Sequence, residues 1–103
     1  MIAISAARIA EAVNGRLAGV PDPDSVTVTS VTTDSREVAP GTLFVAKPGE
    51  TTDGHRFVPQ AAAAGAVLHL TEREVLDESG SPYPCVVVED VVLAMGALAS
   101  CVV

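Results

Sequence analysis

Short runs of aliphatic and β-branched residues recur along this chain of 103 residues. Residues 43–46 and 85–88 are apolar throughout, which is typical of strands buried on both faces of a sheet. Residues 26–33 form a run of Val, Thr and Ser that also favours a strand, and residues 16–20 and 66–70 predict two more. The chain should therefore fold around a sheet.

Helix signals lie between these expected strands. Helices are predicted at residues 5–13, from residue 55 or 56 to residue 64, and from residue 91 onward. Ser5 and Asp90 are placed to cap the first and third helices, and Pro59 is tolerated if it lies in the first turn of the second. Residues 71–83 are polar and should hold at most one helical turn, around residues 73–76.

Strands that alternate with helices predict a small layered α/β domain with a mostly parallel or mixed sheet flanked by helices. The length suits a single domain with one modest core. Apolar residues make up 49% of the chain but aromatic residues only 3%, so Val, Ala, Leu and Ile must fill that core.

The net charge of −7 argues against nucleic acid as a partner, because phosphate contacts need a basic surface. A small anionic ligand remains compatible with this charge, since Arg36, Lys47 and Arg56 lie close together in the sequence. These three cations could equally be ordinary surface charges.

The remaining composition excludes several classes of protein. No apolar stretch has the length of a membrane span, and no basic region followed by an apolar run marks a secretory signal, so we expect a cytoplasmic protein. Cys85 and Cys101 lie in apolar surroundings and are expected to be small buried thiols. No cluster of Cys and His predicts a metal site.

The segment from residue 33 to residue 55 carries most of the functional information. A Thr-Asp-Ser-Arg turn, the apolar strand 43–46 and a Gly-containing loop that ends in Asp-Gly-His follow one another within it. Hydroxyl groups, loop N–H groups and a nearby cation are what the oxygens of a phosphorylated small molecule need. The segment therefore predicts a binding site for such a molecule.

Other interpretations of this segment remain open. Asp34 and Ser35 could simply form an Asx or Ser turn. Ser35 could also be the nucleophile of a Ser-His-Asp triad, since His55, His69 and several carboxylates are present, but the Gly-x-Ser-x-Gly pattern of hydrolases is missing. The phosphate loop of ATP-binding domains is missing too, so binding is expected here and no catalytic residue.

These motifs, taken together, resemble the Mur ligases of bacterial cell-wall synthesis at their N-terminal uridine-nucleotide-binding domain. The resemblance covers essentially the whole chain and keeps the family's order and spacing. The matching motifs are Thr33-Asp34-Ser35-Arg36, Pro40-Gly41-x-Leu43-Phe44-Val45-Ala46, Gly49, Asp53-Gly54-His55, Gln60-Ala61, Ala64-Gly65-Ala66 and Val87-Val88-Glu89-Asp90.

The resemblance implies where the substrate binds. In the family, the residues that match Thr33 and Ser35 contact the uridine diphosphate part of the substrate. The three residues after Gly49 do so as well, and here they are Glu50, Thr51 and Thr52. Arg36 and His55 adjoin these positions and are candidates for the same site, whereas no metal ligand is expected.

The resemblance also implies that residues 1–103 are the N-terminal domain of a longer, three-domain ligase. A central ATPase domain would use ATP and magnesium to activate the peptide carboxylate of a UDP-N-acetylmuramoyl-peptide, and a C-terminal domain would bring the amine. This domain would need no cofactor itself; its partners would be the nucleotide substrate and its own ATPase domain. The last helix, which reaches Val103 without a polar stop, also favours a fragment.

Two members of the family fit the chain. Residues 1–4 and 9–19 look most like the member that adds D-alanyl-D-alanine, whereas Lys47-Pro48-Gly49 is closer to the sister that adds the third amino acid. A stand-alone module that binds a nucleotide sugar or a protein, and a small hydrolase that uses Ser35, are the alternatives of other classes.

Overall fold

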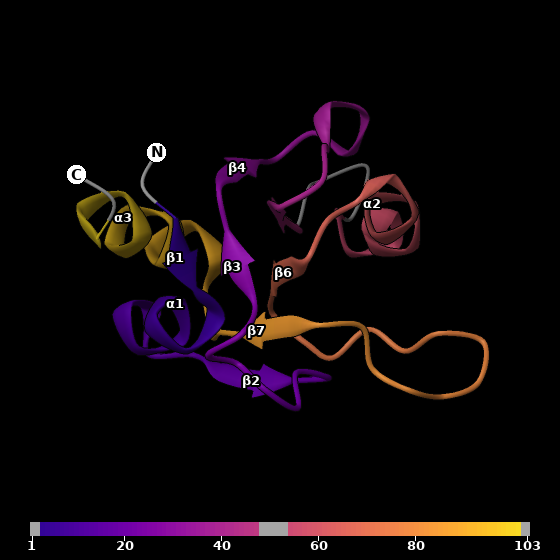
Figure 1. Ribbon diagram of the computed structural model, residues 1–103, viewed down its shortest axis with the longest axis horizontal. Coiled ribbons are helices and arrows are strands. Elements are labelled where there is room, and N and C mark those ends of the chain that lie inside the picture. Colours follow the sequence, from indigo (N-terminus) through magenta and orange to yellow (C-terminus); the bar gives the residue numbers. More distant parts are fainter. Residues whose placement is uncertain (1–2, 48–53, 102–103) are drawn as a thin grey trace.

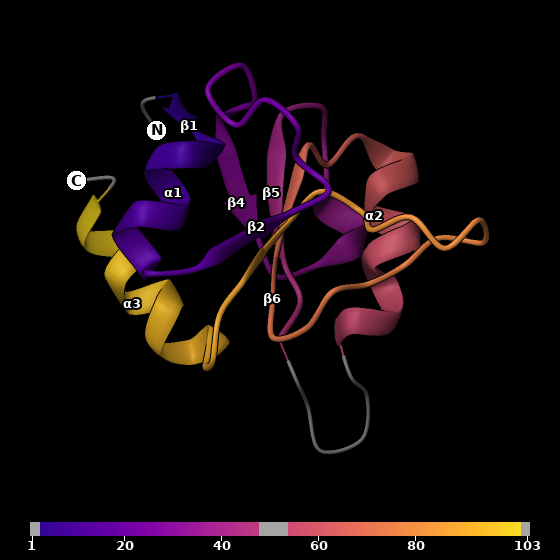
Figure 2. The ribbon, with the colours of Figure 1, turned by 90° about the horizontal axis from the view of Figure 1, so that it is seen from below.

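The computed structural model describes residues 3–47 and 54–101, and these fold into three layers (Figures 1 and 2). A five-stranded sheet in the order β2-β7-β6-β5-β4 forms the middle layer. Helices α1 (Ala6–Val13) and α3 (Val91–Cys101) cover one face of this sheet, and α2 (Val58–Ala64) covers the other. The prediction of a layered α/β domain is confirmed.

The sheet is mixed, because its edge strand β2 (Arg16–Ala18) is antiparallel to β7 while the other four strands are parallel. The parallel strands are β4 (Ser30–Thr32), β5 (Thr42–Val45), β6 (Leu68–Thr71) and β7 (Cys85–Val87). The short strands β1 (Ile4–Ser5) and β3 (Thr27–Val28) form a separate antiparallel pair. Two 3₁₀ helices, η1 (Ser35–Glu37) and η2 (Gly54–Phe57), lie in the connections.

Strand β5 divides the core into two clusters. Leu43 and Val45 belong to the cluster beneath α1 and α3, whereas Phe44 belongs to the cluster beneath α2 with Val58 and Ala61. This split follows from the pleat of a strand, which sends successive side chains to opposite faces. All four residues of β5 are buried, as the apolar run in the sequence predicted.

Capping geometry confirms the predicted starts of α1 and α3, and the second predicted helix is the 3₁₀ helix η2 followed by α2. The Ser5 hydroxyl accepts a hydrogen bond from the Arg8 N–H at 3.2 Å, and the Asp90 carboxylate accepts one from the Val92 N–H at 2.9 Å. Pro59 lies in the first turn of α2, where a missing N–H costs no hydrogen bond. Gly65 ends α2 in the left-handed conformation that favours glycine.

The structure differs from the sequence prediction in two places. Residues 26–33 form two strands, because Val28 pairs with Ile4 in the small sheet while Val31 pairs with Leu43 in the large one. The helical turn expected at residues 73–76 is wrong. The hydrogen bond from Tyr83 N to Val75 O, at 2.9 Å, runs across a hairpin-like loop instead of along a helix.

Two titratable side chains, those of His69 and Cys85, are buried within the sheet. His69 is fully buried between the rings of Phe44 and Tyr83, and its Nδ1 lies 2.8 Å from the carbonyl oxygen of Pro84. Burial lowers the pKa of His69 and raises that of the Cys85 thiol. Both groups are therefore expected to be uncharged at neutral pH.

Two glycines provide a matched test of this backbone. We expect Gly65→Ala to lower the free energy of unfolding by more than about 1 kcal/mol, since φ there is +117° and a Cβ would lie 2.9 Å from Pro40 N. Gly96→Ala should raise it by about 0.5–1 kcal/mol, because alanine favours the helix and a Cβ there has nothing within 4 Å. Urea denaturation of both variants measures the difference, and equal stabilities would contradict the assigned backbone geometry.

Candidate functional site

The carboxyl ends of the four parallel strands meet at one edge of the sheet. Residues 33–37 follow β4, Lys47 lies just beyond β5, Glu72 follows β6, and Asp90 lies beyond β7. Ligands of open α/β sheets bind outside this edge, because the loops there converge while the strands hold them in place. The predicted Thr-Asp-Ser-Arg turn therefore lies at the edge where such ligands bind.

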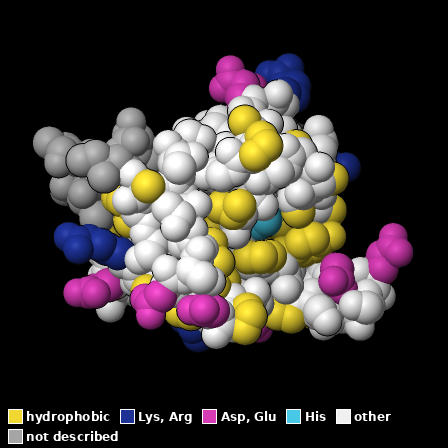
Figure 3. Space-filling model, viewed as in Figure 1, with side chains coloured by type: hydrophobic (Ala, Val, Ile, Leu, Met, Phe, Trp, Pro, Cys, Tyr) yellow, Lys and Arg dark blue, Asp and Glu magenta, His cyan; other side chains and the backbone are white. Residues whose placement is uncertain are grey.

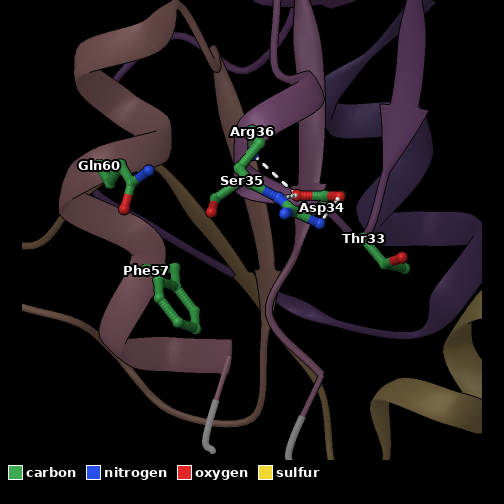
Figure 4. A pocket seen from close by; sticks show the side chains of 6 residues that line it. All are labelled: Thr33, Asp34, Ser35, Arg36, Phe57 and Gln60. Atoms are coloured by element: carbon green, nitrogen blue, oxygen red, sulfur yellow. Dashed lines mark hydrogen bonds and ion pairs between the residues drawn. The ribbon is translucent and has the colours of Figure 1, made fainter.

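A surface hollow of about 510 Å³ lies beside this turn (Figure 4). The 3₁₀ helix η1 with the residues before it forms one wall, and the start of α2 forms the other. The lining residues are Thr33, Asp34, Ser35, Arg36, Phe57 and Gln60. The volume is within the range of small-molecule sites, so the hollow can accept part of a nucleotide.

Local hydrogen bonds fix the conformation of the turn. The Thr32 hydroxyl accepts a hydrogen bond from the Asp34 N–H at 3.1 Å, and the Asp34 carboxylate accepts one from the Arg36 N–H at 2.9 Å. Asp34 thereby caps η1, so the simple turn interpretation is true of its backbone. The Ser35 hydroxyl points from η1 into the space before α2, whereas Thr33 points away from that helix (Figure 4).

Asp34 and Arg36 form a bidentate ion pair at the rim of the hollow. The Arg36 Nε donates to Asp34 Oδ1 at 3.0 Å, and Nη2 donates to Oδ2 at 2.9 Å. These hydrogen bonds hold the pKa of Asp34 below its usual range. Because the pair uses one edge of the planar guanidinium, the opposite edge still faces outward and can donate to an anion.

The other predicted site residues either do not line this hollow or lie outside the described residues. Lys47 is exposed at the carboxyl end of β5, while Glu50, Thr51 and Thr52 lie outside the described residues. His55 is only 2% exposed and does not line the hollow. Its Nε2 instead accepts a hydrogen bond from the Glu72 N–H at 2.9 Å.

Phe57 and Gln60 complete the hollow, although neither was predicted from the sequence as a site residue. Phe57 is half-buried, with the Arg56 guanidinium carbon 5.8 Å from its ring centroid, and Gln60 is exposed one turn later. Residues three apart on a helix lie on the same side. The spacing of Phe57 and Gln60, in a helix predicted directly after the Asp-Gly-His motif, is the sequence signal that could have assigned both residues to the hollow.

The surface charge of the domain is dispersed. On the face shown in Figure 3, acidic side chains lie around the rim while apolar side chains gather towards the middle. Within residues 3–47 and 54–101, His, Cys, Asp and Glu side chains form no group of three that could hold a metal ion. No helix in this described part has the length and apolar character needed to cross a membrane.

Comparison with known proteins supplies a family match. Residues 27–100 match the family described as "Mur ligase family, catalytic domain". The chain is 38% identical over 100 residues to the UDP-N-acetylmuramoyl-tripeptide–D-alanyl-D-alanine ligase of Escherichia coli, covering 97% of this chain and 20% of that protein. It is 41% identical over 98 residues to the UDP-N-acetylmuramoyl-L-alanyl-D-glutamate–2,6-diaminopimelate ligase of Streptomyces avermitilis, covering 94% of this chain and 19% of that protein.

Solved structures give the same result at the level of the fold. The UDP-N-acetylmuramoylalanyl-D-glutamyl-2,6-diaminopimelate–D-alanyl-D-alanyl ligase of Acinetobacter baumannii superposes with a TM-score of 0.80 at 28% sequence identity. The match covers 97% of this chain and 21% of that one. The chain thus spans about a fifth of the length of the relatives it matches.

The Asp34–Arg36 pair predicts a specific titration. We expect the Asp34 carboxyl to titrate below its ordinary pKa of 3.8, and its pKa to rise in Arg36→Gln because the side-chain donors are lost. Any stabilisation from the pair is complete above the ordinary pKa and disappears as the pH falls through the lowered one.

Carboxyl ¹³C shifts measured against pH test this expectation. Asp77 is the internal control, because hydrogen bonds from the Ser79 side chain and the Ser81 backbone, not from an arginine, lower its pKa. Its titration should stay unchanged in Arg36→Gln. If the pKa of Asp34 also stays unchanged in Arg36→Gln, the Asp34–Arg36 pair does not persist in solution.

Proposed function

Because the chain belongs to the Mur ligase family, we propose that it is the N-terminal domain that binds the uridine diphosphate part of a UDP-N-acetylmuramoyl-peptide in a peptidoglycan ligase. The observation that carries this proposal is the hollow beside η1, which presents the Ser35 hydroxyl at the carboxyl edge of the sheet. The two named relatives both carry UDP-N-acetylmuramoyl-peptides in their names, which supports this class of substrate.

The chemistry of the hollow suits a nucleoside diphosphate. Ser35 and the outward edge of Arg36 supply donors for phosphate oxygens, while the Phe57 ring offers an apolar surface to a base or ribose. The Asp34 carboxylate offsets part of the local positive charge, so hydroxyl and N–H donors are expected to carry more of the binding than net charge.

The proposed full-length enzyme divides its work between domains. ATP and magnesium would be held elsewhere, since this sequence has no Gly-x-x-x-x-Gly-Lys-Ser/Thr loop. This domain would bind the uridine diphosphate part of the substrate. That part lies far from the carboxylate that is activated by phosphorylation and attacked by the amine. A soluble nucleotide substrate supports a cytoplasmic location for the enzyme.

Of the two sister ligases, we propose the one that adds D-alanyl-D-alanine. The relative of this type from Escherichia coli aligns over 97% of the chain, and the Acinetobacter baumannii structure that matches 97% of the chain carries the same activity in its name. The alternative is the ligase that adds the third amino acid, because the Streptomyces avermitilis relative is 41% identical.

The choice of ligand can be tested on this domain by NMR shift mapping. We expect the labelled 103-residue chain to bind UDP-N-acetylmuramoyl-tripeptide weakly, because contacts from other domains are absent, and to show no response to ATP. Shifts should gather at residues 33–36 and at Phe57 and Gln60, and binding should weaken with added salt. Equal responses to both nucleotides, or shifts centred on Tyr83 and α3, would contradict the proposed site.

Replacing Ser35 tests the site directly. Ser35→Ala should weaken nucleotide binding by about 10- to 150-fold, which corresponds to about 1.5–3 kcal/mol for a lost hydrogen bond to a charged oxygen. Ser25→Ala is the matched control, since that hydroxyl only donates to the Asp22 carbonyl at 3.0 Å in a turn before β3. In the longer enzyme, Ser35→Ala should raise KM and leave kcat nearly unchanged, whereas a loss of kcat at constant KM would indicate a catalytic role.

A further inference from the structure

A short chain of hydrogen bonds joins three segments that are far apart in the sequence. His55 Nε2 accepts from the Glu72 N–H at 2.9 Å, and Glu72 Oε2 accepts from the Val91 N–H at 3.0 Å. His55 lies in η2, Glu72 follows β6, and Val91 begins α3. The start of η2 is thereby tied to the same sheet edge that carries the Thr-Asp-Ser-Arg turn.

The first of these bonds requires one chemical form of His55. A nitrogen that accepts a hydrogen bond carries no proton, so the ring proton must be on Nδ1 and the ring must be neutral. The backbone N–H of Glu72 donates to His55, and His55 is only 2% exposed. Loss of this acceptor would leave a part-buried N–H unpaired, which costs more than an exposed hydrogen bond is worth.

A second attachment holds Gly54, the residue before His55, to the end of β5. Gly54 N donates to the Lys47 carbonyl at 2.9 Å, and a Cβ on Gly54 would lie only 2.6 Å from that oxygen. The backbone before His55 is therefore held against the end of β5, while the His55 ring holds it to the end of β6. Phe57 follows two residues later in the same 3₁₀ helix and packs against the core cluster beneath α2, so these two attachments hold the backbone from which its side chain extends.

We propose that His55 is a positioning residue for the uridine-nucleotide site: its Nε2 acceptor holds η2 against β6 and so sets the place of Phe57 opposite Ser35. This inference rests on the proposed function. It differs from the expectation that His55 contacts the ligand, since the buried ring does not line the hollow and acts through Phe57.

Two substitutions separate positioning from contact. His55→Gln keeps an acceptor close to the position of Nε2 but removes the other ring nitrogen, whereas His55→Leu keeps the volume and removes both. We expect His55→Leu to weaken binding of uridine diphosphate by about two- to tenfold, the range for a lost neutral hydrogen bond, and His55→Gln to restore most of that loss. The Phe57 amide shift should move in His55→Leu and return in His55→Gln.

The wild-type chain is measured first, so that the two proposals can fail separately. Absence of uridine diphosphate binding to wild type would overturn the proposed function and this inference with it. If wild type binds, equal weakening by both variants with an unmoved Phe57 amide indicates direct contact and overturns positioning. Unchanged binding in a folded His55→Leu overturns it too.

The ring nitrogens give a readout that does not depend on the ligand. A long-range ¹H–¹⁵N spectrum of the wild-type imidazole should show the proton on Nδ1 and an unprotonated Nε2, with coupling to the Glu72 amide lost in His55→Leu. A proton on Nε2 at neutral pH would overturn the inference even if uridine diphosphate binds. If His55→Leu does not fold, the wild-type spectrum and His55→Gln still decide the question.

Discussion

The burial of β5 and β6 on both faces is the constraint on which the rest of this structure depends. Strand β5 sends alternate side chains into two apolar clusters, and β6 buries Leu68 and Leu70 on one face and His69 and Thr71 on the other, so helices must cover both sides of the sheet. The chain meets this requirement with α1 and α3 on one side and α2 on the other (Figure 2). The parallel pairing of β5 with β6 fits this arrangement, because parallel strands need a long connection that crosses between them, and here that connection contains α2.

Parallel pairing in turn creates the functional edge. Four strands that run the same way end at the same side, and their following loops are brought together although they lie far apart in the sequence. Part-buried hydrogen bonds also link His55, Glu72 and Val91 at this edge. A rigid sheet thus positions loops whose own contacts would be too few to hold a ligand-binding geometry.

The charged groups at this edge are mostly satisfied within the domain. Asp34 neutralises one edge of Arg36, and the carboxylates of Glu72 and Asp90 cap the first turn of α3. The start of α3 is therefore already occupied by anions of the protein itself, whereas the hollow beside η1 is the site proposed for the nucleotide. A domain with a charge of −7 can bind an anion in this way, because local donors rather than total charge decide the contact.

Local signals in the sequence determined the elements and their ends. Apolar runs of four residues identified β5 and β7, and Ser5 and Asp90 marked the starts of helices, because a cap depends on residues only a few positions away. The Thr-Asp-Ser-Arg motif likewise predicted, from local chemistry alone, the turn that lines the proposed site. Strand runs, helix caps and turns depend on residues that are neighbours in the sequence, so the sequence alone predicts them.

The tertiary structure decided what depends on partners distant in the sequence. Residues 26–33 could not be divided into β3 and β4 without knowing that Ile4 and Leu43 provide their pairing partners. The place of His55 depends on a backbone N–H 17 positions later, and Phe57 joins the hollow only because α2 crosses back over the sheet. Pairing and burial between remote segments are set by the packing of the whole sheet, which no short stretch of sequence encodes.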